Sequence, residues 1–294
     1  MDSAIATVGL PLALIVVMLG LGLGLTPDDF RRTARQPKVV VAALCAQLLV
    51  LPTIAFALIL AFDPDPIIAV GMMLLAASPG GTTANLFSHL FRGDIALNIT
   101  LTAVNSVIAV ITLPIVVNLA VAYFEPTGAE GQVGLQLSKT AEVFAVILVP
   151  VAIGMLVRSR APGFAARADR PVRALSAVLL VAVIAGTLLA ERANIADYVA
   201  EVGALTALFC VCSLTIGYLL PRLVGVTERQ ALATAFEVGI HNSTLAITVA
   251  ISVMGDEQLA IPAAIYGIVM FPLAALTGVV LTRGRATVPA SQTP

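Results

Sequence analysis

Long apolar runs separated by short polar links extend over almost the whole chain. A helix needs about 20 apolar residues to cross a bilayer, and by this measure the pattern predicts nine membrane spans. They are expected at residues 5–25, 38–62, 67–91, 95–124, 138–157, 172–190, 198–220, 231–253 and 259–282. The runs do not alternate polar and apolar positions, as the strands of a membrane barrel do. The predicted fold class is therefore an all-α polytopic membrane protein with nine transmembrane helices.

Composition leads to the same class. Hydrophobic residues make up 59% of the chain and charged residues 11%, whereas soluble domains carry about 25% charged residues. The three cysteines are odd in number and lie inside apolar runs, so we predict no disulfide framework. The net charge of -1 gives no indication of a nucleic-acid partner, and no feature points to a protein partner. The lipid bilayer is the expected environment.

Basic residues fall into alternate connections between the predicted spans. These connections contain most of the Lys and Arg residues: Arg31, Arg32, Arg35, Lys38, Arg92, Arg158, Arg160, Arg167, Arg170, Arg173, Arg222, Arg229, Arg283 and Arg285. The opposite links are acidic, for example at Asp63, Asp65, Asp256 and Glu257. Because cytoplasmic loops are enriched in Lys and Arg, we expect a cytoplasmic C-terminus and an N-terminus outside. This requires an odd number of spans. The expected location is a bacterial inner (plasma) membrane.

Two predicted spans are interrupted by polar and glycine-rich sequence. Residues 78–85 read Ser-Pro-Gly-Gly-Thr-Thr-Ala-Asn, and residues 237–243 read Glu-Val-Gly-Ile-His-Asn-Ser. Of the 17 acidic residues, Glu237 is the one that cannot be placed near the end of a span. A carboxylate at mid-bilayer costs about 2.5 to 3.5 kcal/mol, so it is expected to face a partner or an aqueous cavity. We interpret this position as an ion or proton site.

The two interruptions occupy corresponding places in two similar series of spans. In each series a long span precedes the interrupted one, and a span with a proline, Pro114 or Pro272, follows it. The series match at a separation of about 158 residues, and an odd number of spans places them with opposite topology. Inverted repeats of this kind are typical of secondary transporters, whose sites lie where the repeats meet.

Interrupted helices leave backbone carbonyls that must be satisfied inside the protein, because hydrocarbon offers no water. Freed carbonyls suit a cation, and the positive end of the half-helix that starts near Thr82 suits an anion. Hard cations bind to oxygen ligands. Oxygen-bearing side chains gather around the interruptions: Gln47, Asn85, Asn98, Thr102, Glu237 and Asn242.

Several polar residues in the spans have two readings that the sequence leaves open. Small polar side chains also hold membrane helices together. This packing role and a role in the ion site fit equally well for Thr100, Asn105, Ser106 and Thr248. A less favoured reading of Glu237 is a protonated acid that bonds to neighbouring helices.

These interruptions, followed by Arg92-Gly93-Asp94 and Ala96-Leu97 after the first, resemble those of the bile acid:sodium symporter family. The similarity extends from about residue 12 to 281. It implies a panel of spans one, five and six beside a core with two crossing broken helices. The implied boundaries are a panel helix in 1–34, a first core half in 35–124 with its broken helix at 78–85, panel helices in 125–195, a second core half in 196–286 with its broken helix at 237–243, and a cytoplasmic tail in 287–294.

The resemblance also implies two sodium ions as the coupled cofactors. A first site would use Asn85, Asn98, Thr102 and Glu237. A second would use Gln47, Glu237, the carbonyls of Val238 and Ile240, and His241. Substrate would lie near Thr82, Asn85 and Asn242. The chain departs from the family at Ala84, where a serine is frequent, and at His241, where glutamine is usual.

The function implied is a sodium-coupled symporter, not an enzyme, that imports an organic anion by alternating access. The anion is a bile-acid-like molecule or a small carboxylate, and the absence of Trp weakly favours the small one. The alternative is a proton-coupled transporter or antiporter in which Glu237 and His241 titrate. An intramembrane hydrolase would need a second embedded acid or a metal cluster, and the sequence contains no His-Glu-x-x-His run.

Overall fold

The computed structural model describes residues 36–128, 131–132, 149–150, 152–168 and 195–283, together with a few residues between 15 and 23 and between 171 and 178. Almost all of these are helical. The exception is a small antiparallel pair of strands, β1 (Thr127–Gly128) and β2 (Gly131–Gln132). The predicted panel spans at 5–25, 138–157 and 172–190 lie mostly outside the described residues, so the count of nine spans stays a prediction.

Six predicted spans coincide with described helices to within a few residues. The first three are the continuous run α3 (Pro37–Cys45), η2 (Ala46–Val50) and α4 (Leu51–Phe62), the pair α5 (Pro66–Ala77) and α6 (Thr82–Leu90), and α7 (Ile95–Phe124). The last three are α10 (Ile195–Leu223), then α11 (Glu228–Gly239) with α12 (Ser243–Val249) and η3 (Ala250–Met254), and finally η4 (Gln258–Ala260) with α13 (Ile261–Thr282).

Helix length and surface chemistry identify a polytopic membrane protein. Four helical runs in the described part are long and apolar enough to cross a bilayer: Pro37–Phe62, Ile95–Phe124, Val202–Leu223 and Gln258–Thr282. Large apolar side chains are exposed along them, such as Leu49 on η2 and Ile111, Ile115 and Leu119 on α7. The last three recur every four residues, so they form one apolar stripe along α7. In water this stripe would be unfavourable, whereas lipid solvates it.

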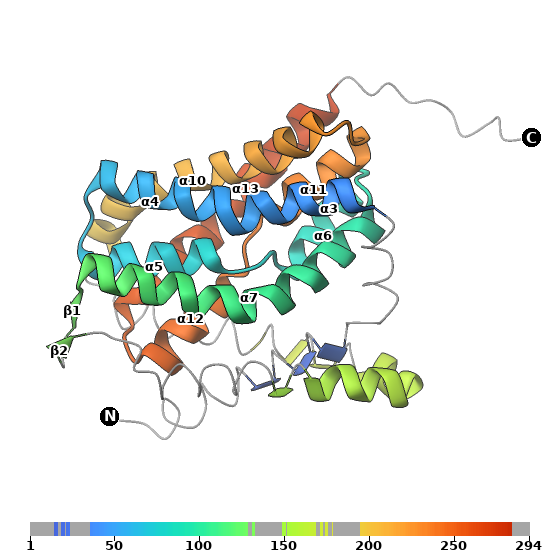
Figure 1. The fold of residues 1–294 in the computed structure, drawn as a ribbon, viewed down its shortest axis with the longest axis horizontal. Helices are drawn as coiled ribbons and strands as arrows, with labels where there is room; N and C mark the ends of the chain where they lie inside the picture. Colours follow the sequence, from blue (N-terminus) through green and yellow to red (C-terminus); the bar gives the residue numbers. More distant parts are fainter. Residues whose placement is uncertain are drawn as a thin grey trace, which may run out of the picture.

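The helix ends gather at two opposite ends of the bundle (Figure 1). The starts of α3, α7 and α11 lie at the same end, where the Asp94 N–H donates to the Arg229 carbonyl at 2.9 Å and the Gln230 side chain donates to Gln36 at 2.8 Å. The run from α3 to α4 leads away from this end, whereas α10 leads towards it (Figure 1). The run from α3 to α4 and helix α10 therefore point in opposite directions.

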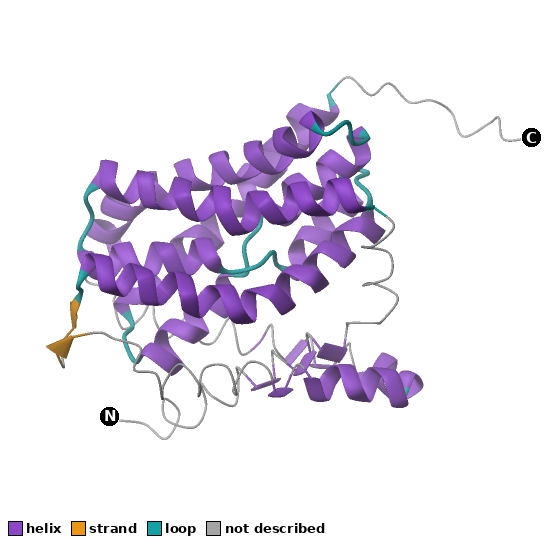
Figure 2. Ribbon diagram, viewed as in Figure 1, coloured by secondary structure: helices purple, strands orange, loops and turns teal. Residues whose placement is uncertain are grey.

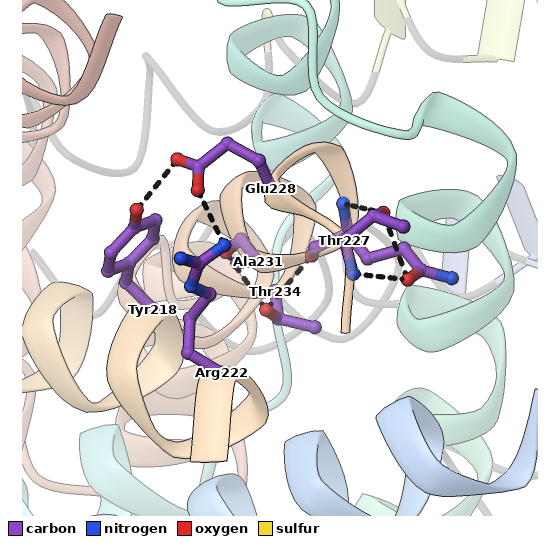
Figure 3. A network of polar contacts seen from close by, with 7 residues as sticks. Tyr218, Arg222, Thr227, Glu228, Ala231 and Thr234 are labelled. Carbon is purple, nitrogen blue, oxygen red and sulfur yellow. Dashed lines mark hydrogen bonds and ion pairs between the residues drawn. The ribbon is translucent and has the colours of Figure 1, made fainter. Parts of the chain in front are cut away.

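The same two ends of the bundle differ in charge. The end where α3 begins holds Lys38, Arg92, Arg222, Arg229 and Arg283, opposed by Asp94 and Glu228. The other end holds the described acidic residues Asp63, Asp65, Glu125, Asp256 and Glu257. At the basic end a polar network closes the turn between α10 and α11 (Figure 3): Glu228 accepts from Tyr218 at 2.6 Å and from Arg222 at 2.7 Å.

The charge separation predicts which end faces the cytoplasm, and cysteine labelling checks it. In a background without Cys45, Cys210 and Cys212, single cysteines at Asp63 and Asp256 should react with an impermeant thiol reagent added outside intact cells. A cysteine at Arg285 should react only after the membrane is opened. Labelling of position 285 from outside would reverse the orientation or change the number of spans.

Two central segments interrupt the helices, and they lie within the two stretches where the sequence predicted breaks. Figure 2 shows them as the loops in the middle of the bundle, while other loops lie at its ends. The first comprises residues 78–81, and α6 begins at Thr82, where the sequence predicted the start of a half-helix. The second comprises residues 240–242 instead of 237–243, because α11 continues through Gly239. Glu237 therefore lies in the last turn of a regular helix.

Close helix packing brings the second interruption against α10. A Cβ atom on Gly217 of α10 would lie 2.9 Å from the Thr234 carbonyl oxygen and 2.8 Å from the Val238 side chain, distances that only a glycine permits. A longer side chain would push the helices apart. The missing side chain thus sets the distance between α10 and the last turns of α11.

Candidate ion-binding site at the crossing of two interrupted helices

The two interruptions cross and pair through their backbones. Gly80 lies opposite His241 in a single antiparallel bridge. The Gly81 N–H donates to the Ile240 carbonyl at 2.8 Å, and the Asn242 N–H donates to the Pro79 carbonyl at 2.8 Å. Each interruption thus satisfies backbone groups that the other leaves without a helical partner, as a bilayer interior requires. Segments about 160 residues apart in sequence form one unit.

Two side chains contact the Ser78 carbonyl beside this bridge. Gln47 Nε2 donates to it at 2.9 Å, and His241 Nδ1 lies 3.1 Å from it. A carbonyl only accepts, so Nδ1 carries a proton, and in a neutral ring Nε2 then carries the lone pair. The Gln47 Oε1 and His241 Nε2 atoms are buried, and no described group bonds to them.

Gln47 reaches the crossing from an irregular turn. It lies in η2, a π-helical turn that ends where the Leu51 N–H donates to the Ala46 carbonyl, five residues earlier. Pro52, which follows directly, has no N–H to continue the regular ladder. Such π turns frequently occur at functional sites. The position of Gln47 is therefore set by a local backbone feature.

Glu237 lies beside the bridge and is fully buried. Its Oε2 accepts from the Thr102 hydroxyl at 2.5 Å, and its Oε1 lies 3.5 Å from Asn105 Nδ2. The second distance exceeds the usual range for an N–H donor, so Oε1 is weakly satisfied. No other carboxylate whose side chain the structure describes is buried. An anionic Glu237 in this position requires a positive partner.

Gly80 leaves room for this carboxylate. A Cβ atom there would overlap the Glu237 side chain and would lie 2.5 Å from the Glu237 backbone oxygen. At Gly81, by contrast, the nearest atom to an added Cβ would be Thr83 Oγ1 at 3.4 Å, an ordinary contact. The two positions therefore differ. Position 80 requires a glycine because Glu237 lies so close to it, whereas position 81 has room for a side chain.

One face of α7 supplies further amide and hydroxyl groups. Asn98 Nδ2 donates to the Ser88 hydroxyl and to the Ala233 carbonyl, both at 2.8 Å, which fixes the orientation of its amide. Thr102 and Asn105 follow at spacings of four and three residues, so all three lie on the same face. Helices α6, α7 and α11 thereby meet around Glu237.

The region contains more buried oxygen acceptors than donors. Four side-chain amide oxygens are buried without a hydrogen-bond partner among the described residues: Gln47 Oε1, Asn85 Oδ1, Asn98 Oδ1 and Asn105 Oδ1. A buried polar atom without a partner costs about 1 to 3 kcal/mol. A carboxylate together with unpaired neutral oxygens is the chemistry that binds a hard cation.

Comparison with known proteins agrees with this chemistry. A model of the Sodium Bile acid symporter family matches residues 11–198, more than half of the chain. The chain belongs to the sodium bile acid symporter family. This is a family of sodium-coupled transporters and not of enzymes.

Relatives from plants, bacteria and animals share the similarity. A probable sodium/metabolite cotransporter, BASS1, of Arabidopsis thaliana chloroplasts is 29% identical over 253 residues, which cover 86% of this chain and 61% of that protein. The uncharacterized sodium-dependent transporter YocS of Bacillus subtilis is 26% identical, covering 86% and 76%. The human ileal sodium/bile acid cotransporter is 26% identical, covering 87% and 73%. The chain thus spans less than two thirds of the plant relative.

The residues that the family resemblance suggested for sodium lie in two places around the crossing. Thr102 bonds Glu237, and Asn98 lies one turn before Thr102 on α7. Gln47 and His241 meet at Ser78, while the Ile240 carbonyl accepts from Gly81. Val238 lies in the last turn of α11. None of these contacts tests sodium binding, so both sodium sites of the sodium bile acid symporter family stay predictions for this chain.

The suggested substrate residues lie at helix starts. Thr82 and Asn85 belong to the first turn of α6. Asn242 caps α12, because its Oδ1 accepts from the Leu245 N–H at 3.1 Å. This oxygen is therefore engaged in the structure, whereas the Asn85 Oδ1 is not. Substrate binding by these three residues also stays a prediction.

Three residues near the crossing were not predicted from the sequence. Tyr266 of α13 donates to the Gly239 carbonyl at 2.8 Å and contacts the His241 ring edge-on at a centroid distance of 5.4 Å. Phe209 of α10 stacks on the same ring at 5.3 Å. Ser88 holds Asn98. A serine or an aromatic residue in an apolar helix gives no signal of its own, because packing alone accounts for it.

Proposed function

We propose that this chain is a sodium-coupled symporter that imports an organic anion by alternating access. One observation carries the proposal: the buried carboxylate of Glu237 lies at the crossing of two interrupted helices, among unpaired amide oxygens. The matched family and the sodium-coupled names of the relatives support sodium as the ion.

Two sodium ions are proposed to bind on either side of Glu237. The first would be held by Asn85, Asn98, Thr102 and Glu237, and the second by Gln47, Glu237, the Val238 and Ile240 carbonyls and His241. His241 Nδ1 faces the Ser78 carbonyl, so Nε2 is the ring atom whose lone pair is left for an ion. Gln47 Oε1 is likewise buried and unpaired.

We propose that alternating access uses two groups of helices, α3–α7 and α10–α13. We propose that they are inverted repeats, since α5 and α11 begin at residues 66 and 228 and α6 and α12 at residues 82 and 243. The backbone bridge ties the repeats together, so they would move as one core against the panel spans. Sodium would favour the conformation in which its ligands converge, and the ion gradient would thereby drive uptake.

The anion is proposed to bind near the start of α6. The N-terminus of a helix carries unpaired N–H groups and a partial positive charge, which favour a carboxylate. Relatives are named for bile acids and for metabolites. A small carboxylate is the proposed class, with a bile-acid-like anion as the alternative. The proposed location is a bacterial inner membrane with the basic end of the bundle in the cytoplasm.

Uptake by purified protein in liposomes tests the function. An inward sodium gradient should drive accumulation of a labelled small carboxylate, such as pyruvate, or of taurocholate, and an equal potassium gradient should not. Before uptake is measured, sodium should raise the thermal unfolding midpoint of the detergent-solubilised protein, because a ligand that binds the folded state stabilises it. The absence of any sodium effect on either measurement would contradict sodium coupling.

His241 distinguishes sodium coupling from the proton-coupled alternative. A glutamine amide at position 241 can donate to the Ser78 carbonyl as the imidazole Nδ1–H does, so His241→Gln should fold and retain sodium-driven uptake. Its uptake should vary less with pH than that of the wild type, because the amide does not titrate. Proton coupling predicts the reverse: uptake driven by an inward proton gradient without sodium, which His241→Gln abolishes.

A further inference from the structure

We infer that Asn105 is a further ligand of the sodium ion bound at Glu237, an inference that rests on the proposed function. Asn105 lies on α7 and is buried, with 1% of its surface exposed. It is not among the sodium ligands that the family resemblance implies. Its side chain is the one amide in the described residues with a contact to the Glu237 carboxylate.

The first argument concerns the unpaired oxygen of Asn105. Its Nδ2 faces Glu237 Oε1 at 3.5 Å, and its Oδ1 is buried without a hydrogen-bond partner among the described residues. Oδ1 and Nδ2 are bonded to the same carbon, so Oδ1 is within reach of an ion held by Glu237 Oε1. A side chain that only packed the helices together would pair this oxygen with a donor.

The second argument concerns the two oxygens of Glu237. Oε2 is firmly bonded by Thr102 at 2.5 Å, whereas Oε1 has only the long contact to Asn105. The lone pairs of Oε1 are thus the ones still open to a cation. A half-turn of the Asn105 amide about its Cβ–Cγ bond would exchange its weak N–H contact for an oxygen–cation bond. Hard cations prefer such carboxylate and amide oxygens.

Helix geometry supplies the third argument. Asn98, Thr102 and Asn105 occupy one face of α7, two helical turns in length, and the middle one touches Glu237. Asn98 and Asn105 flank Thr102 with unpaired Oδ1 atoms on both sides. An ion at Glu237 would therefore meet ligands from three successive turns of one helix. Asn105 would add a ligand about one turn C-terminal to Thr102.

Sodium titration of the purified protein tests the inference without knowledge of the substrate. The thermal unfolding midpoint is measured against sodium chloride, with choline chloride holding the ionic strength constant. In Asn105→Ala, one ligand oxygen is lost. The sodium concentration that gives half of the maximal stabilisation should therefore rise at least about tenfold. The matched control is Asn118→Ala, which removes an amide about 20 Å further along the same helix and should leave the titration unchanged.

Asn105→Asp separates a ligand from a packing residue. An aspartate keeps an oxygen at the same position, and a cation bound between it and Glu237 offsets the repulsion of the two carboxylates. It should therefore bind sodium within about threefold of the wild type, even where Asn105→Ala is too unstable to purify. A sodium response in Asn105→Ala equal to that of the wild type, or loss of the response in Asn105→Asp, would overturn the inference. If the wild type itself does not respond to sodium, the proposed function fails instead.

Discussion

Replacing Glu237 with glutamine should abolish sodium-driven uptake while the protein still folds and reaches the membrane. The amide keeps the size of the side chain, can accept from Thr102, and can donate to the unpaired Asn105 Oδ1. Only the charge is lost. One charge pair at 4 Å is worth about 4 kcal/mol at an effective dielectric constant near 20. Sodium affinity should therefore fall about a thousandfold.

The measurement is sodium-driven uptake together with the sodium dependence of the unfolding midpoint. Glu257→Gln is the matched control, because it makes the same chemical change at an exposed residue in the link before η4. The control should transport normally. Near wild-type sodium-driven uptake in Glu237→Gln would show that the ion does not need this carboxylate.

Replacing Gly80 with alanine should impair sodium binding almost as severely, and replacing Gly81 should not. The added methyl group at position 80 would overlap the Glu237 carboxylate and press on its backbone oxygen, at 2.5 Å. Relief requires the carboxylate to turn or the backbone bridge to separate. Overpacking of this kind typically costs about 1 to 3 kcal/mol, so we expect sodium affinity to fall roughly 10- to 100-fold.

Gly81→Ala is a closely matched control, since it adds the same methyl group one residue away. Gly81 has φ -94°, which alanine adopts freely, and its nearest neighbour at the added Cβ would be 3.4 Å away. Comparing sodium titrations of the two variants, with membrane yield measured for each, checks the expectation. Equal effects of both substitutions would mean that backbone flexibility, and not the space beside Glu237, is what the glycines provide.

Much of this arrangement is readable from the sequence. Apolar runs of spanning length located six helices to within a few residues, because the bilayer requires them to be long and continuous. Pro79 with two glycines, and a carboxylate in an apolar run, marked both interruptions for the same reason. The family assignment, made on these motifs, is confirmed by the match over residues 11–198.

The sequence could not provide the details of pairing. The sequence predicted that the second interruption begins at Glu237, whereas α11 continues through Gly239, because a lone carboxylate is compatible with either a helix or a loop. It could not show that Gly80 touches Glu237 while Gly81 does not, since that difference arises from a segment about 160 residues away. The contact of Asn105 with Glu237 is likewise a tertiary contact, and its spacing on α7 suits packing equally well.

The backbone bridge has a consequence for how the protein is made. Pro79 and Gly81 emerge from the ribosome long before Ile240 and Asn242, with which they pair. Until then the first interruption holds backbone groups that lipid cannot satisfy. The nascent first half must therefore wait, with the interruption near water or shielded by another protein, and chains that end before residue 240 should be recognised as unfinished and degraded.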